Sequence, residues 1–284
     1  MDQAIRQQAE SHANAAHAAL GDLSQGYPAN HFAFQSILPA LADLGATRVL
    51  EVGIGDGNAI PLLAGAGYDL AGFDIDPARV ERSRERIREY GLPGEAVTWG
   101  DIQDATTYPT VQAAAGFDAL VALGVLPHVH REETTVRNMR ALVRPGGQVF
   151  VECRNKLFSL VTFNRYTYEF LMDDLFAESP APLRASLGEF LGSRLDVSTP
   201  PPPTSGHPAT FHNPLEVPSL FETAGFEDIS VIPFHYHAAA PVFEKSDPQA
   251  FRDGSLAMEN DPSGWRGLFL CSAFLVKATR PLAP

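Results

Sequence analysis

Short apolar segments alternate with helix-length amphipathic segments through the middle of the chain. The apolar segments are predicted strands and lie at 48–52, 69–74, 97–99, 117–123 and 148–152. The segments between them include predicted helices at 59–66, 77–90 and 132–143. Strands that alternate with helices in this way indicate βαβ units and a parallel sheet, so the fold class is α/β.

The flanking parts of the chain add further elements. The same criteria predict helices at 3–20, 32–44 and 217–224 and strands at 229–235 and 268–277. A break at 21–28, which includes Gly21 and Pro28, separates the first two helices. We therefore divide the chain into an N-terminal helical segment, 1–44, and an α/β core formed by 45–156 and 211–284.

Residues 157–210 interrupt the alternation of strands and helices. An aromatic-rich segment at 158–176 precedes one amphipathic helix, whose apolar positions are Leu183, Leu187, Phe190 and Leu191. Four successive prolines, 200–203, then predict a stiff loop. Long insertions in compact domains are usually functional lids or disordered loops, so we interpret 157–210 as a cap insertion. Its aromatic side chains either stack on a sugar or flat ring of a ligand or pack in a core.

A glycine-rich turn follows the first predicted strand. Gly53, Gly55 and Gly57 let the backbone turn sharply and approach a ligand closely, and the helix that follows offers free N–H groups. An ordinary tight turn between strand and helix would look similar. Asp74, however, ends the second strand about 20 residues on, where a carboxylate can accept both ribose hydroxyls of an adenosine. Asp74 could instead cap the next helix, although Asp76 is better placed to do so.

These motifs resemble those of class I S-adenosylmethionine-dependent methyltransferases. The matching stretches, in order, are Glu51–Gly57, Gly72–Pro77, Gly100–Asp104, Phe117–His128 and Leu142–Gly147. The resemblance implies a Rossmann-like, seven-stranded, mostly parallel sheet with flanking helices. Its last strand would be antiparallel, and 268–277 suits that strand. The main alternative family is the nicotinamide-dependent dehydrogenases, but their glycine-rich fingerprint requires a glycine at the position that Asn58 occupies in this chain.

The resemblance also implies S-adenosylmethionine as cofactor and a set of residues that hold it. These residues are Glu51, Gly53, Gly55, Gly57, Asp74, Ile75, Asp101, Ile102 and Leu123. Within this set, Asp74 would accept from the ribose hydroxyls and Ile75 would pack on adenine. Asp101 would accept from the adenine amino group, with Ile102 beside it. Leu123 would line the sulfonium, together with Gly124.

Charge and composition narrow the range of partners. The 284 residues include 21 Lys and Arg against 34 Asp and Glu, a net charge of −13. So acidic a protein repels phosphate backbones, which disfavours nucleic-acid substrates. The polar N-terminus does not resemble a signal peptide, and the apolar run at 267–276 is too short to span a bilayer. Cys153 and Cys271 are isolated and expected to be buried thiols, so we expect a cytoplasmic protein with no membrane partner.

The catalytic residues are less well defined by the sequence. A hydroxyl acceptor must lose a proton, and histidine is the obvious base. We select His128, which follows the fourth strand, and His212, which lies where the cap rejoins the core; either could instead be structural. The only adjacent acidic pair of aspartates, Asp173 and Asp174, lies in the cap, so we expect no metal site.

The expected reaction is in-line O-methylation of a small hydroxylated acceptor. Weak similarity of 154–159 and 163–167 to bacterial methyltransferases of saccharide or natural-product pathways favours an acceptor of that kind. N-methylation of a small amine, and a non-catalytic nucleoside-binding protein with a methyltransferase-like fold, remain alternatives. A homodimer is left open.

Overall fold

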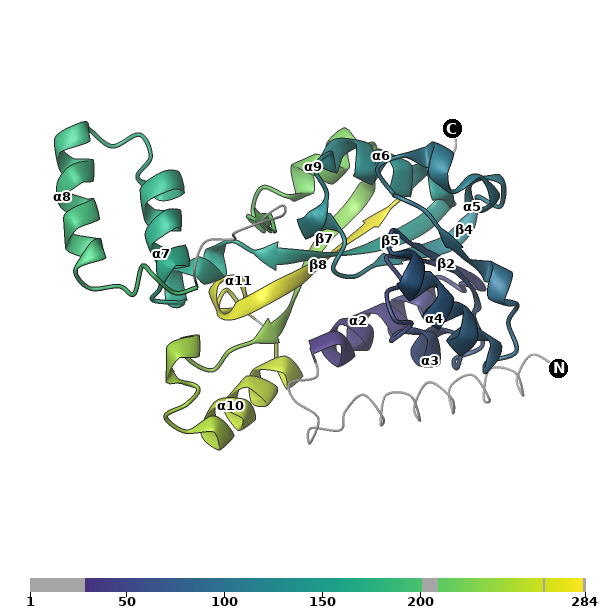
Figure 1. The fold of residues 1–284 in the computed structure, drawn as a ribbon, viewed down its shortest axis with the longest axis horizontal. Helices are drawn as coiled ribbons and strands as arrows, with labels where there is room; N and C mark the ends of the chain where they lie inside the picture. The colour runs from purple at the N-terminus through teal and green to yellow at the C-terminus, as the bar shows by residue number, and fades with distance from the viewer. Residues whose placement is uncertain (1–28, 201–208, 263, 283–284) are drawn as a thin grey trace. The chain divides into compact units, whose positions relative to one another are not determined.

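The computed structural model describes residues 29–200, 209–262 and 264–282 (Figure 1). The helix predicted at 3–20, the break at 21–28 and most of the proline-rich segment lie outside the described residues. The chain divides into two compact units. The first contains the described residues up to Cys153, Glu216–Ile232 and the residues from Leu275 onward; the second contains Arg154–Leu215 and Pro233–Phe274. The interpretation of 157–210 as a cap stays a prediction.

A mostly parallel sheet forms the core of the first unit, and three of its strands include residues of the second unit. Its strands are β1 (Arg48–Val52), β2 (Asp69–Asp74), β3 (Val97–Trp99), β4 (Phe117–Ala122), β5 (Val143–Asn155), β7 (Glu227–Tyr236) and β8 (Cys271–Thr279). Their order across the sheet is β3-β2-β1-β4-β5-β8-β7, and the four pairs from β3 to β5 are parallel. This arrangement confirms the predicted Rossmann-like α/β fold. Val49, Leu50 and Leu120, on the central strands, have no exposed surface.

The predicted direction of the last strand is also confirmed. At one end of β8, Asn155 Nδ2 donates to the Cys271 carbonyl at 2.8 Å. At the other end, the Arg280 carbonyl accepts from Gly146 N at 2.8 Å. The start of β8 thus lies beside the end of β5, so the two strands run in opposite directions (Figure 1). β8 begins at Cys271, later than predicted, because Gly267–Leu270 forms a short helix, α11.

Six α-helices belong to the described part of the first unit. They are α2 (Ala29–Asp43), α3 (Ile60–Leu63), α4 (Pro77–Arg88), α5 (Pro109–Ala113), α6 (Glu132–Leu142) and α9 (Pro218–Thr223). The helix at 29–43 begins earlier than predicted, the helix at 109–113 was not predicted, and the other four helices match predicted ones with shorter ends. The start of α4 illustrates the local cause: the Asp76 carboxylate accepts from Ala78 N at 2.8 Å, and Pro77 occupies the first turn. α4 buries Val80 and Ile87, which lie two helical turns apart. Asp76, rather than Asp74, is therefore the helix cap.

The second unit is mainly helical. Its elements are the 3₁₀ helices η5 (Leu157–Val161) and η7 (Pro241–Phe243), the π-helix η6 (Phe170–Leu175), α7 (Arg165–Glu169), α8 (Ala181–Gly192), α10 (Pro248–Asn260) and α11. A two-residue strand, β6 (Phe211–His212), pairs with Arg154 and Asn155 and brings the sheet to eight strands within the described ranges. α8 is the predicted amphipathic helix, but none of its residues is buried. The sequence analysis did not predict α10.

Both cysteines are free and buried, as expected. Among the described residues, no group of three or more His, Cys, Asp or Glu side chains is arranged to bind a metal ion. Asp173 and Asp174 each form an ion pair instead, with Arg184 at 3.0 Å and Lys156 at 2.7 Å. None of the described helices combines the length and the apolar character needed to cross a bilayer.

Candidate active site

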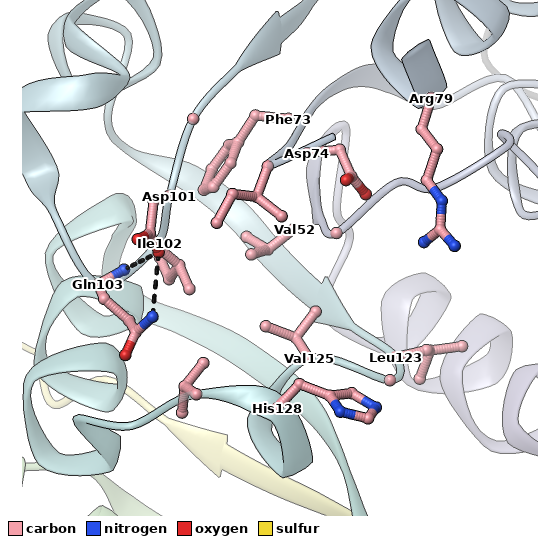
Figure 2. A pocket seen from close by; sticks show the side chains of 15 residues that line it. Val52, Phe73, Asp74, Arg79, Asp101, Ile102, Gln103, Leu123, Val125 and His128 are labelled. Atoms are coloured by element: carbon pink, nitrogen blue, oxygen red, sulfur yellow. Dashed lines mark hydrogen bonds between the residues drawn. The ribbon is translucent and has the colours of Figure 1, made fainter. Parts of the chain in front are cut away.

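A cavity of about 410 Å³ lies at the carboxyl ends of the parallel strands in the first unit. Four successive strand ends contribute to its wall, as expected where parallel strands of an open sheet terminate. Its lining includes Gly53 after β1, Asp74 and Ile75 at the end of β2, Asp101 and Ile102 after β3, and Leu123 and His128 after β4 (Figure 2). The structure therefore brings together most of the residues that the sequence singled out.

The glycine turn after β1 has the backbone geometry that the motif predicts. Gly53, Gly55 and Gly57 have φ values of +70°, +57° and +73°, a region that favours glycine. A Cβ at Gly53 would overlap the side chain of Val125, which follows β4. Glycine at position 53 thus allows two loops to approach each other at the cavity wall.

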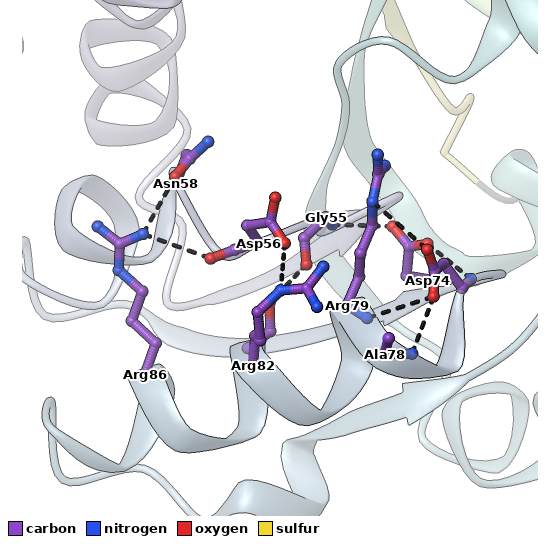
Figure 3. A network of polar contacts seen from close by, with 10 residues as sticks. Gly55, Asp56, Asn58, Asp74, Ala78, Arg79, Arg82 and Arg86 are labelled. Carbon is purple, nitrogen blue, oxygen red and sulfur yellow. Dashed lines mark hydrogen bonds and ion pairs between the residues drawn. The ribbon is translucent and has the colours of Figure 1, made fainter.

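Side chains of helix α4 contact the glycine turn after β1 and fix its position (Figure 3). Ser83 Oγ donates to the Gly55 carbonyl at 2.7 Å. Arg82 Nε forms an ion pair with the Asp56 carboxylate at 2.6 Å. Exposed ion pairs contribute little stability, so the buried Ser83 contact is the stronger constraint on the turn. Gly55 and Gly57 support the cavity wall rather than lining it.

The Asp74 carboxylate is held in a fixed orientation at the cavity. The side chain is buried, with 5% of the residue exposed, and its Oδ2 accepts from Gly55 N at 2.8 Å. Its Oδ1 accepts from Asp76 N at 2.9 Å. Each carboxylate oxygen can accept a further hydrogen bond, which leaves acceptor capacity for two hydroxyl groups of a ligand. This geometry fits the vicinal hydroxyls of a ribose.

An apolar surface and a second carboxylate lie further along the cavity. Ile75 lines the wall although 60% of the residue is exposed, so its side chain offers a surface for a flat ring. Trp99 Nε1 donates to the Ile75 carbonyl at 2.9 Å and fixes the backbone there. Asp101 Oδ1 accepts from Gln103 N at 2.9 Å, and Ile102 is buried beside it. An apolar wall next to a carboxylate suits adenine and its amino group.

Glu51 lies on β1 but is not among the cavity-lining residues. Its carboxyl is buried, and Oε2 has no hydrogen-bond partner among the described residues. Burial raises the pKa of Glu51 from 4.5 to about 8, and the negative charge of Asp74 adds to the rise. The Glu51 carboxyl is therefore protonated in the folded protein at neutral pH.

The Glu51→Gln variant should remove a pH dependence of stability. Between pH 4.5 and about 8 the folded state binds one proton that the unfolded state lacks, so the free energy of unfolding falls as pH rises. The fall is about 1.4 kcal/mol per pH unit, so the variant should gain that much relative to the wild type between pH 6 and pH 7. Urea unfolding at both pH values measures the gain. Glu85→Gln, at an exposed position of α4, is the matched control; equal gains in both variants would contradict the assignment.

The two candidate bases lie in different units. His128 ends the 3₁₀ helix η4 (Leu126–His128), lines the cavity and is exposed to solvent. His212 lies on β6 in the second unit and is buried, with 7% of the residue exposed. Its carbonyl accepts from Lys156 N at 2.9 Å. The cavity therefore contains one of the two selected histidines.

Seven lining residues were not selected from the sequence: Val52, Phe73, Arg79, Gly100, Gln103, Val125 and Val129. Arg79 lies in the first turn of α4, and its Nε is 3.7 Å from the Asp76 carboxylate. Gln103 belongs to the Gly100–Asp104 motif, which was the available signal for it. Val125 lies within the Phe117–His128 motif, but its contact with the Gly53 turn depends on the approach of two loops that are distant in the sequence.

Comparison with known proteins identifies the family to which the chain belongs. A family profile described as "Methyltransferase domain" matches residues 27–231. The chain is 28% identical over 130 residues to the ubiquinone biosynthesis O-methyltransferase of Azoarcus sp. (strain BH72) and 31% identical over 132 residues to that of Aromatoleum aromaticum. Each match covers 46% of this chain and 54% of the relative, so the chain spans about half the length of these curated relatives. A crystal structure of the S-adenosylmethionine-dependent methyltransferase SibL in its apo form aligns with 25% identity, a TM-score of 0.45, and coverage of 87% of this chain and 54% of that one.

Proposed function

Because the chain belongs to the methyltransferase-domain family of class I S-adenosylmethionine-dependent methyltransferases, we propose that it methylates a hydroxyl group of a small acceptor. The enzyme uses S-adenosylmethionine as methyl donor. The observation that carries the proposal is that Asp74 and His128 line one cavity: a carboxylate suited to ribose and an imidazole suited to proton removal. The curated relatives described above carry names of O-methyltransferases, which supports a hydroxyl acceptor.

In this proposal the cavity wall binds the cofactor through three kinds of contact. The Asp74 carboxylate accepts hydrogen bonds from the ribose hydroxyls, and the Asp101 carboxylate accepts from the adenine amino group. Ile75 and Ile102 pack against the adenine ring. Two carboxylate contacts and an apolar face discriminate adenosine from ligands that lack either feature, because buried acceptors left without a donor cost free energy.

His128 acts on the acceptor rather than on the cofactor. When bound, S-adenosylmethionine supplies a methyl group on a positively charged sulfur, and the carbon–sulfur electron pair leaves with S-adenosylhomocysteine. His128 accepts the hydroxyl proton on a ring nitrogen as the acceptor oxygen bonds to the methyl carbon. The imidazole then releases that proton to solvent, to which it is exposed. The cavity also holds the acceptor close to the methyl group, which lowers the entropic part of the barrier.

The proposed acceptor is a small hydroxylated molecule of saccharide or natural-product type. The acidic chain, with a net charge of −13, disfavours polyanionic acceptors. A hydroxyl acceptor must lose a proton, which His128 can accept, whereas an amine that arrives with a free electron pair needs no base.

Paired acceptor probes test this assignment. The protein is incubated with S-adenosylmethionine and catechol, or with the matched amine 1,2-diaminobenzene; methyl glucoside extends the hydroxyl series. S-adenosylhomocysteine formation and the methylated product are measured by mass spectrometry. We expect O-methyl product from a hydroxyl probe and none from the amine. Product from the amine alone, or no turnover with any probe, would contradict O-methylation.

A further inference from the structure

Gln103 links two loops of the cavity wall. Its side-chain Oε1 accepts from His130 N at 2.8 Å and from Arg131 N at 3.1 Å. In return, the Arg131 guanidinium donates to the Gln103 carbonyl at 2.9 Å. These three hydrogen bonds join the loop after β3 to the loop between η4 and α6.

The two backbone donors are at the start of α6. The first N–H groups of a helix have no partner within the helix and need an external acceptor. Arg131 is the N-cap residue of α6, and no side chain of its own segment caps it. Gln103 therefore supplies, from a distant loop, an acceptor for the N–H of the N-cap residue and for that of the residue before it.

At its other end, Gln103 contacts the carboxylate assigned to adenine. Gln103 N donates to Asp101 Oδ1 at 2.9 Å, and its side-chain Nε2 lies 3.4 Å from the same oxygen. Asn138, on α6, donates to the Ile102 carbonyl at 2.7 Å and ties the same loop to the helix. A continuous set of hydrogen bonds thus runs from Asp101 through Gln103 to the segment that follows His128.

We propose that Gln103 is a positioning residue that couples adenine binding at Asp101 to the placement of the His128 turn. This rests on the proposed function for the roles of Asp101 and His128. A donor on adenine fixes the Asp101 carboxylate, which orders Gln103 through two contacts. Ordered Gln103 in turn holds His130 N and Arg131 N, two and three residues beyond His128. The imidazole is therefore ordered when the cofactor site is filled.

Amide exchange of His130 and Arg131, followed by NMR, tests the coupling without an acceptor or turnover. In the wild type, saturating S-adenosylhomocysteine should slow exchange of both amides by about fivefold or more, the low end of usual coupling between sites. S-inosylhomocysteine, which carries an oxygen in place of the adenine amino group, should bind more weakly and, at saturation, leave exchange within about twofold of the free protein, well below that coupling.

Two substitutions separate coupling from simple helix capping. In Gln103→Met the slowing by S-adenosylhomocysteine should disappear. Gln103→Glu keeps the acceptor for both amides but loses the Nε2 donor toward Asp101, so its amides should stay protected in the free protein while the slowing by the ligand is reduced. Gln112→Met, at an exposed position of α5, controls for the change of side chain.

A purely structural cap would speed exchange in Gln103→Met by the same factor with and without ligand, and that result would overturn the proposal. So would equal slowing by the two nucleosides in the wild type, a comparison that needs no variant to fold. If O-methylation or the role of His128 as base were disproved, the expected amide exchange of His130 and Arg131 would not change. The two proposals can therefore fail separately.

Discussion

The His128→Ala variant should lower kcat by about 10²- to 10⁴-fold, the usual contribution of a general base. The imidazole lines the cavity and is exposed, so its removal deletes a proton acceptor without opening the core. Affinity for S-adenosylhomocysteine, measured by calorimetry, should stay within about threefold, a change of less than 1 kcal/mol. The hydroxyl probe that gives product with the wild type serves as substrate.

His212→Ala provides the comparison for this prediction. A fall in kcat for His212→Ala with wild-type kcat for His128→Ala would move the base to the second unit. If both variants keep wild-type kcat, neither histidine is the base. Catalysis would then depend on proximity, as for an amine acceptor or one that arrives deprotonated.

The Asp74→Ala variant should weaken binding of S-adenosylhomocysteine by about 1.5 to 3 kcal/mol, the range for a lost charge-assisted hydrogen bond. That corresponds to roughly 10- to 150-fold in Kd. The carboxylate also accepts from Gly55 N and Asp76 N, so the variant loses part of the turn geometry as well as the ligand contact. Calorimetry measures the affinity, and the melting temperature reports the structural part.

Asp76→Ala separates these two contributions. Asp76 caps α4 and is not among the cavity-lining residues, so its loss should lower stability by about 0.5 to 2 kcal/mol with little change in affinity. Unchanged affinity in Asp74→Ala would contradict the ribose assignment. An equal loss of affinity in both variants would mean that the helix start, rather than the Asp74 carboxylate, determines binding.

Local patterns in the sequence predict the strands that build the site. β1, β2 and β3 have the predicted ends because each is a short apolar segment next to a clear turn, such as Gly53 after Val52. The sequence left open whether Asp74 caps α4. The structure excludes that role, because Asp76 accepts the first N–H groups of α4. Motif spacing is local information, so it predicts well which residues after the strand ends line the cavity.

Features that depend on the approach of distant segments were not predictable. The contact of Gln103 with His130 and Arg131 joins loops that follow different strands. The local sequence of one loop does not indicate where the other loop lies. α8 has the apolar spacing of a packed helix, yet the structure leaves all its residues at least partly exposed. Periodicity predicts that a helix forms but does not determine what covers it. His212 was selected by its place in the chain, which does not define a position relative to the cavity.

The position of β8 has a consequence for the assembly of the sheet. β8 follows β7 in the chain but lies between β5 and β7 in the sheet. Until β8 is available, β5 and β7 lack the strand that joins them in the sheet. Unpaired strand edges are templates for aggregation. Insertion of β8 is therefore the step that covers the facing edges of β5 and β7.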